Sequence, residues 1–254
     1  MTKCCSIIVF IVTILSPDSR AQKIENLRVH FGLYAFESDV KTKNMIRSFE
    51  PQTSPYAYAN HQFDAQYQSL FAGFAAERNL AAKLSVSAGL QYARMTGHLE
   101  MNRMYEGPDY FYYRFREEGT VTEYYRIREF QQNAHYVGVP VDLRYSPLNR
   151  NFKITVRAGT EINYRIASNG SADFVDREME QYEDQFIDSF DRPDPLNVII
   201  VVGAGISYGK PGKANYGVEI AGPCVSVTQK AGGMFTPTAG AGFSLFVKVP
   251  LNVK

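Results

Sequence analysis

The dominant pattern in this sequence is a strict two-residue alternation of apolar and polar side chains, repeated in one segment after another. In residues 153–166, Ile154, Val156 and Ala158 fall on one side of the pattern, while Lys153 and Arg157 fall on the other. Successive side chains of a β-strand point to opposite faces, so each segment has one apolar and one charged face. A charged face does not suit the core of a β-sandwich, whereas it suits the interior of a small barrel whose outer face meets lipid. The alternation therefore predicts a transmembrane β-barrel.

Eight segments of this kind follow one another along the chain, at residues 27–36, 66–76, 84–95, 136–145, 153–166, 198–208, 216–221 and 242–249. Most are close to the roughly 9–11 residues that a tilted strand needs to cross a bilayer. The segment 216–221 must extend at one or both ends, and both faces of 66–76 are mixed, which leaves its register open. We therefore expect an all-β fold, an eight-stranded antiparallel transmembrane β-barrel.

The connections between these segments alternate between short and long. Those at 77–83, 146–151 and 209–215 are short, and those at 37–65, 96–133, 167–197 and 222–241 are long. Bacterial outer-membrane barrels have short periplasmic turns and longer extracellular loops in this order. A soluble lipocalin-like or sandwich protein does not require it. We expect both mature termini on the periplasmic side of a Gram-negative outer membrane.

The first 21 residues read as a cleaved secretory signal peptide, which leaves residues 22–254 as the barrel domain. Lys3 precedes an apolar run of 12 residues at 4–15, and Ser19, Arg20 and Ala21 form a small-x-small cleavage site. A membrane-anchoring helix is the alternative, but it requires about 20 apolar residues.

Composition agrees with an exported β-protein and shows no basic excess that would point to nucleic acid. Removing residues 1–21 takes Lys3, Arg20 and Asp18 from the 27 basic and 26 acidic residues, which leaves equal numbers of each. Cys224 is then the single thiol, so an intramolecular disulfide is excluded. The chain has 17 Tyr, 17 Phe and 19 Gly but no Trp, a mixture that favours strands and turns.

One hairpin carries a family resemblance. The run Tyr136-Val137-Gly138-Val139-Pro140-Val141-Asp142-Leu143-Arg144-Tyr145, a polar turn, and the strand with Arg157-Ala158-Gly159 resemble PorT-type outer-membrane β-barrels, which are small barrels like OmpA. The resemblance covers the mature chain in architecture and this hairpin in motif. It implies an outer-membrane barrel, and some members of that family take part in protein secretion. It carries over no catalytic residue.

Charged side chains recur on the inward faces of the predicted strands. With Arg28, the inward set comprises Asp142, Arg144, Lys153, Arg157, Glu161, Arg165, Glu219 and Lys248. An eight-stranded barrel has an interior barely wide enough for its own side chains, and buried charges must be paired. We expect an ion-pair network in the lumen, with a conduit for ions or small solutes as the alternative. Pairing Tyr145 with Phe152 would place Asp142 opposite Thr155.

Two of the long connections have unusual composition. In 167–197, Val175, Met179, Tyr182, Phe186 and Phe190 recur at helical spacing opposite acidic residues, which predicts a short amphipathic helix over the barrel mouth. In 96–133, aromatic runs flank a Gly-containing turn, which predicts a hairpin beyond the membrane. Its tyrosines suit either a binding surface or an interfacial girdle. The expected loop surface comprises Tyr112, Tyr113, Tyr124, Glu180 and Asp184.

The sequence favours binding over catalysis. Some outer-membrane barrels modify lipid A with His beside Ser and an acid, and His98, Glu100 and His135 lie near the extracellular strand ends. No nucleophile accompanies them, and no metal or cofactor pattern is present. We expect a non-enzymatic barrel whose loops serve macromolecular binding or envelope and secretion assembly. A lipid-modifying enzyme and a narrow pore are the alternatives. Expected partners are outer-membrane lipid and a protein or glycan at the loops, with no nucleic acid.

Overall fold

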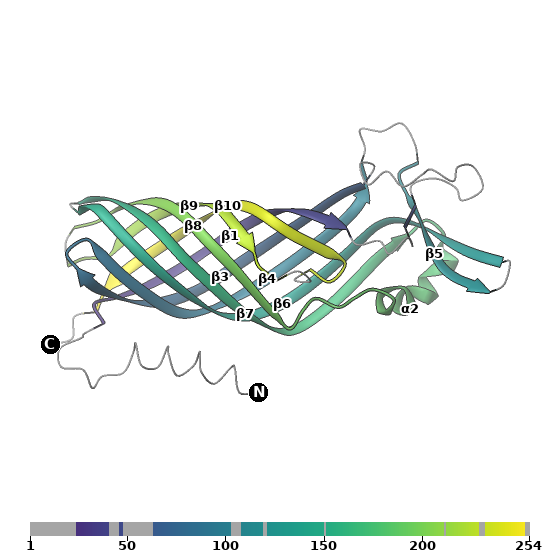
Figure 1. Ribbon diagram of the computed structural model, residues 1–254, viewed down its shortest axis with the longest axis horizontal. Helices are drawn as coiled ribbons and strands as arrows, with labels where there is room; N and C mark the ends of the chain where they lie inside the picture. The colour runs from purple at the N-terminus through teal and green to yellow at the C-terminus, as the bar shows by residue number, and fades with distance from the viewer. Residues whose placement is uncertain are drawn as a thin grey trace.

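The computed structural model describes residues 24–40, 46–47, 63–102, 108–118, 121–149, 151–210, 212–228 and 232–251. Eight antiparallel strands close into one barrel in the order β6-β4-β3-β1-β10-β9-β8-β7, and the pairing of β6 with β7 completes the ring (Figure 1). The strands are β1 (Asn26–Val40), β3 (Phe63–Ala81), β4 (Leu84–Met101), β6 (Val121–Asn149), β7 (Phe152–Phe174), β8 (Leu196–Tyr208), β9 (Asn215–Ser226) and β10 (Phe235–Pro250). The prediction of an eight-stranded antiparallel barrel is confirmed.

The remaining elements are β2 (Ile46–Arg47), β5 (Phe111–Glu118), the 3₁₀ helix η2 (Arg177–Tyr182) and α2 (Glu183–Asp188). No helix in the described part of the chain is long and apolar enough to cross a membrane. The predicted signal peptide at 1–21 lies outside the described residues.

The outer face of the barrel is a belt of exposed apolar side chains. It includes Val29, Phe31, Leu70, Phe74, Leu90, Val137, Leu143, Val156, Ile200, Val202, Ile206, Ile220, Phe243 and Leu245. Exposed tyrosines lie at both borders of this belt. Tyr145, Tyr208 and Tyr216 are at one border, and Tyr92 and Tyr164 at the other. An apolar band between two aromatic girdles is the surface that a transmembrane barrel presents to lipid.

The two ends of the barrel differ. At the short-turn end, the connections are residues 82–83, 150–151 and 209–214, and β1 begins there beside the end of β10, with Asn26 opposite Pro250. At the long-loop end, β3, β4, β6 and β7 stay paired with one another beyond the points where β3 stops pairing with β1 and β7 stops pairing with β8. The β7–β8 pairing ends at Tyr164 and Leu196, whereas the β6–β7 pairing runs on to Ile127 and Phe174.

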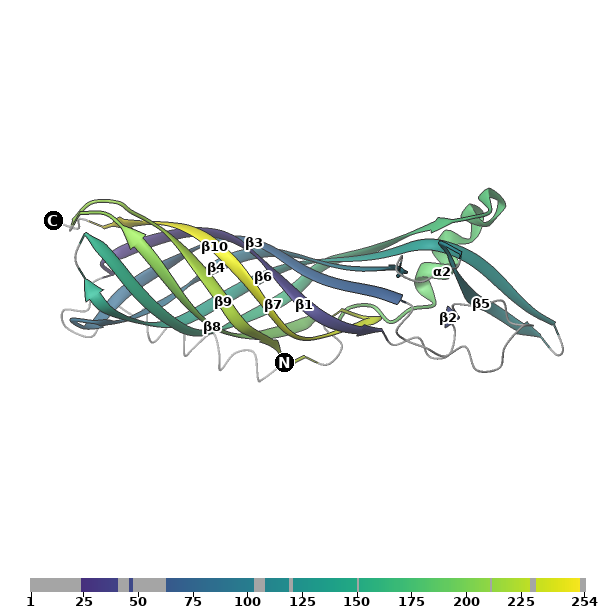
Figure 2. The same ribbon diagram turned by 90° about the horizontal axis from the view of Figure 1, so that it is seen from above.

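We call this continuation the projection; it consists of residues 63–66 of β3, 97–101 of β4, 121–133 of β6 and 167–174 of β7, together with β5, η2 and α2. Figure 2 shows it extending from one side of the barrel. The sequence reading ended these strands too early because it followed the apolar outer face. That face becomes polar where the strands leave the belt, at Arg94, Thr96 and His98 on β4, although the alternation continues.

The register across the β6–β7 hairpin differs from the expected one. Tyr145 lies opposite Val156 rather than Phe152, and Asp142 lies opposite Gly159 rather than Thr155. The reason is that both strands run on toward the turn and the pairing shifts between Tyr145 and Leu148. Gly159 is required at its position, because a Cβ there would lie 2.2 Å from Oδ1 of Asp142.

Candidate functional site

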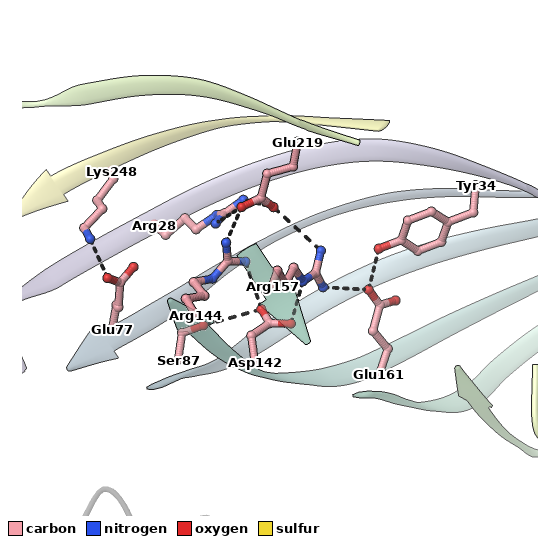
Figure 3. A network of polar contacts seen from close by, with 10 residues as sticks. All are labelled: Arg28, Tyr34, Glu77, Ser87, Asp142, Arg144, Arg157, Glu161, Glu219 and Lys248. Atoms are coloured by element: carbon pink, nitrogen blue, oxygen red, sulfur yellow. Dashed lines mark hydrogen bonds and ion pairs between the residues drawn. The ribbon is translucent and has the colours of Figure 1, made fainter. Parts of the chain in front are cut away.

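A network of three arginines and three carboxylates crosses the barrel lumen (Figure 3). At its centre, Glu219 of β9 accepts a bidentate pair from Arg28 of β1, with Nη1–Oε1 at 2.9 Å and Nη2–Oε2 at 2.5 Å. Arg144 of β6 bonds the same carboxylate, and Nη1 of Arg157 lies 3.8 Å from its Oε2. One acid on β9 therefore joins β1 and the β6–β7 hairpin.

The network continues through Asp142 and Glu161. Asp142 lies 2.6 Å from Nε of Arg157 and 3.1 Å from Nη2 of Arg144. Glu161 lies 3.3 Å from Nη2 of Arg157 and accepts hydrogen bonds from the Tyr34 hydroxyl at 2.7 Å and the Gln91 amide at 2.8 Å.

All six charged side chains are buried, and their formal charges balance. Buried charges are tolerated when they are paired and hydrogen-bonded, and this barrel supplies both conditions from four strands. Because an eight-stranded barrel leaves room only for its own side chains, the network fills the cross-section of the lumen at this level. The arrangement acts as a closed polar layer.

Of the inward charges named from the sequence, Asp142, Arg144, Arg157, Glu161, Glu219 and Arg28 come together in this network. Lys248 instead pairs with Glu77 of β3, nearer the short-turn end. Lys153 also lies at the short-turn end of the lumen and makes no ion pair among the described residues. Arg165 is outside the network, because its guanidinium group donates to the carbonyl of Pro193 in the chain leading to β8.

The sequence reading missed the uncharged partners of the network and one acid. Tyr34, Ser87 and Gln91 all occupy inward positions of predicted strands, so the alternation could have located them. Glu77 falls in a predicted turn because the second predicted strand ends at residue 76, whereas the observed strand β3 continues to Ala81.

The lumen is apolar on the long-loop side of the network. Tyr67, Phe71, Met95, Phe130 and Phe235 are buried there in one cluster. The Phe235 ring lies over Gly97, where a Cβ would come within 2.3 Å of it. An aromatic plug thus closes the barrel a second time, where the sequence had predicted a polar interior throughout.

The hydrophobic core of the lumen continues into the projection. The Phe186 ring of α2 is fully buried and packs against Tyr113 of β5, Phe130 of β6 and Phe174 of β7 at centroid distances of 4.7, 5.4 and 5.6 Å. The predicted amphipathic helix forms here as two consecutive short helices, η2 and α2. Phe130 also stacks with Phe235, which connects this core to the plug.

Polar contacts fasten the helical segment to the strands. Glu183 Oε1 accepts the backbone N–H of Ala172 at 2.9 Å. Asp176 receives two hydrogen bonds from Arg126, and this bonding raises the pKa of the Arg126 guanidinium group above its ordinary value. The long connection is therefore a folded unit.

The expected loop surface must be corrected at one position. Tyr113 is 1% exposed and belongs to the core of the projection, so it does not present its ring to a partner. The alternation of β5 explains this, because Phe111 and Tyr113 face inward with Phe186. Tyr112 and Tyr124 are half-buried on the β5–β6 hairpin, and Glu180 and Asp184 are exposed on the helical segment.

The two histidines considered for catalysis lie apart on neighbouring strands. His98 Nε2 is 2.9 Å from Glu129 Oε1, and His135 contacts the Tyr92 hydroxyl through Nδ1 at 2.5 Å. Within the described residues, neither histidine is hydrogen-bonded to a serine or cysteine. In the same part of the chain, no three His, Cys, Asp or Glu side chains are grouped to hold a metal ion.

Comparison with known proteins gives one family match and one distant likeness. A family model described as "Outer membrane protein beta-barrel domain" matches residues 21–221. No curated protein matches the chain. Among solved structures, the transport unit of the autotransporter AIDA-I from Escherichia coli is similar at 6% identity, with 93% of each chain covered and a TM-score of 0.30. A TM-score this low does not establish a shared topology.

Proposed function

Since this chain belongs to the outer membrane protein β-barrel domain family, we propose that it is a non-enzymatic barrel that presents its projection to macromolecules outside a Gram-negative cell. In this orientation the short turns and both ends of the barrel domain face the periplasm, as is general for bacterial barrels.

The observation that carries this proposal is the contrast between the two parts of the molecule. The lumen is filled by a balanced ion-pair layer and an aromatic plug, which favours an anchoring role over a conduit. The projection continues past the apolar belt and encloses the buried ring of Phe186. A rigid, preorganised surface loses less entropy on binding than a mobile loop, so such a unit suits recognition.

The exposed side chains of the projection indicate which class of partner it would bind. Glu180 and Asp184 are exposed on the helical segment, and Tyr112 and Tyr124 lie partly exposed on the adjoining hairpin. Acidic groups beside aromatic rings suit a protein or glycan partner. The resemblance to PorT-type barrels adds assembly of a secretion apparatus as one form of this role.

Site-directed photocrosslinking in intact cells tests the proposal. A crosslinking residue at Asp184 should capture a macromolecule, whereas the same residue at Lys213, an exposed site at the short-turn end, should not capture the same species. Protease and glycosidase treatment of the adduct then separates a protein from a glycan partner.

A charge-reversal variant of the projection, with a charge reversal at the opposite end of the barrel as its control, tests the same proposal. Glu180→Lys combined with Asp184→Lys should weaken capture by a crosslinker at Tyr112, while Lys213→Glu should leave it unchanged. Both residues are exposed, so the barrel should keep its heat-dependent electrophoretic mobility. Loss of lipid A modification in His98→Ala, without loss of any captured partner, would instead favour an enzyme and overturn the proposal.

A further inference from the structure

A polar cavity of about 270 Å³ opens at the short-turn end, between the ion-pair network and solvent. We call it the turn-end vestibule; among the residues that line it are Glu77, Ser85, Ser146, Lys153, Asn215 and Lys248. A smaller cavity of about 30 Å³ shares these six residues and continues inward to Arg28, Arg144 and Glu219. The vestibule is thus the outer chamber of the lumen on this side.

The charges around the vestibule do not balance. Of the described residues, its lining includes four lysines, Lys83, Lys153, Lys213 and Lys248, and two acids, Glu25 and Glu77. Glu77 is paired with Lys248, and Glu25 accepts the side-chain amide of Asn79. The network deeper in the lumen is neutral within itself, so it offers no spare carboxylate. Lys153, without an ion pair among the described residues, therefore leaves excess positive charge facing the chamber.

Buried polar groups complete the lining. Ser85 and Asn215 are 7% and 5% exposed, and the Ser146 hydroxyl lies 3.3 Å from that of Thr155. Asn215 donates its amide to the carbonyl of Lys213, while its Oδ1 atom is buried and has no hydrogen-bond partner in the described part of the chain. Lysine ammonium groups and serine hydroxyls bind phosphate oxygens, and the Asn215 oxygen can accept a hydroxyl from a protonated phosphate or from glycerol.

We propose that the turn-end vestibule binds a phosphate group, carried by free phosphate or by a phospholipid headgroup, with Lys153 as its principal cation. This site is independent of the role proposed for the projection. Tyr145, Tyr208 and Tyr216 lie on the outer wall at this end, and such aromatic girdles lie at headgroup level, so the vestibule lies at the depth of the phospholipid headgroups.

Titration of the full-length protein in maltoside micelles with inorganic phosphate tests the site, at constant ionic strength because exposed charges are screened by salt. Calorimetry should detect saturable binding. Lys153→Gln should weaken it about tenfold, the effect expected when a charge-assisted hydrogen bond is removed. Lys210→Gln removes an exposed lysine from the same end of the barrel, outside the residues that line the vestibule, and should change the affinity less than about twofold.

A second arm separates the two sources. Short-chain phosphatidylglycerol, added to the same micelles, should compete with inorganic phosphate if headgroups reach the vestibule, and should not compete if only free anions do. Lys153→Glu should abolish binding of either probe. The proposal is overturned if neither probe binds the wild-type protein, or if Lys153→Gln and Lys210→Gln reduce binding equally, since the effect would then be that of diffuse surface charge. Unchanged heat modifiability shows that each variant is folded.

Discussion

Arg28 and Glu219 form a two-pronged ion pair inside the barrel, although 191 positions separate them in the chain. Their side chains are 4% and 3% exposed, and Arg144 and Arg157 approach the same carboxylate. Glu219 is therefore the acid on which the charge balance of three buried arginines depends.

Neutralising this acid should destabilise the barrel severely. Glu219→Gln leaves the guanidinium groups of Arg28 and Arg144 buried with too little negative charge, a change that typically costs about 3–5 kcal/mol. We expect the midpoint of unfolding in urea, followed by heat-dependent electrophoretic mobility, to fall strongly. Asp188→Asn removes the acid of an exposed ion pair with Arg192 and should cost about 1 kcal/mol or less. Equal midpoints for the two variants would show that the lumen network is not a structural requirement.

The lumen should not conduct. The ion-pair layer and the aromatic plug occupy successive levels of the barrel, and an eight-stranded barrel has little free cross-section. Planar-bilayer recordings of the purified protein should show no steady conductance. Stable channels whose ion selectivity changes in Arg157→Gln or Glu161→Gln would contradict a packed lumen.

The projection should lose its order when its central ring is removed. Phe186→Ala deletes a fully buried ring that contacts Tyr113, Phe130 and Phe174, a change that typically costs about 3–5 kcal/mol. We expect limited proteolysis to cut within residues 176–192, while the remaining barrel keeps its heat modifiability. Gln185→Ala alters the neighbouring exposed side chain and should leave the segment protected. Protection of both variants would mean that the aromatic core does not hold the helices.

The border of the lipid-facing belt can be tested by placing a charge on either side of it. Val202 of β8 lies on the outer face within the belt, so Val202→Arg should destabilise the folded barrel by about 2–4 kcal/mol in bilayers. Ser168→Arg introduces the same charge on β7 beyond Tyr164, where the strand has entered the projection, and should have little effect. The comparison is made from the folded fraction in a urea series with vesicles. Similar losses of stability at both positions would show that the membrane also covers Ser168.

The eight barrel strands were predictable because lipid imposes a simple rule on sequence. A strand with lipid outside and a packed polar lumen inside must alternate, and the segment at 153–166 shows that alternation without ambiguity. The same rule assigned Asp142, Arg157 and Glu219 to the lumen. It could not give the ends of the strands, because beyond Tyr92 of β4 and Ile166 of β7 the outer face becomes polar and its apolar signal disappears.

The sequence by itself determined the number of barrel strands, the inward or outward side of the residues in most of them and the helical spacing around Phe186, since these depend on contacts with a uniform solvent and on local periodicity. The tertiary structure alone decided which inward charges meet. Strand tilt and the register shift near Tyr145 set the height of each residue in the lumen, so Arg28 reaches Glu219, Lys248 reaches Glu77 and Arg165 reaches only a backbone carbonyl. The same three-dimensional arrangement buried Tyr113 and left Lys153 beside a polar cavity, because both outcomes depend on side chains contributed by strands distant in sequence.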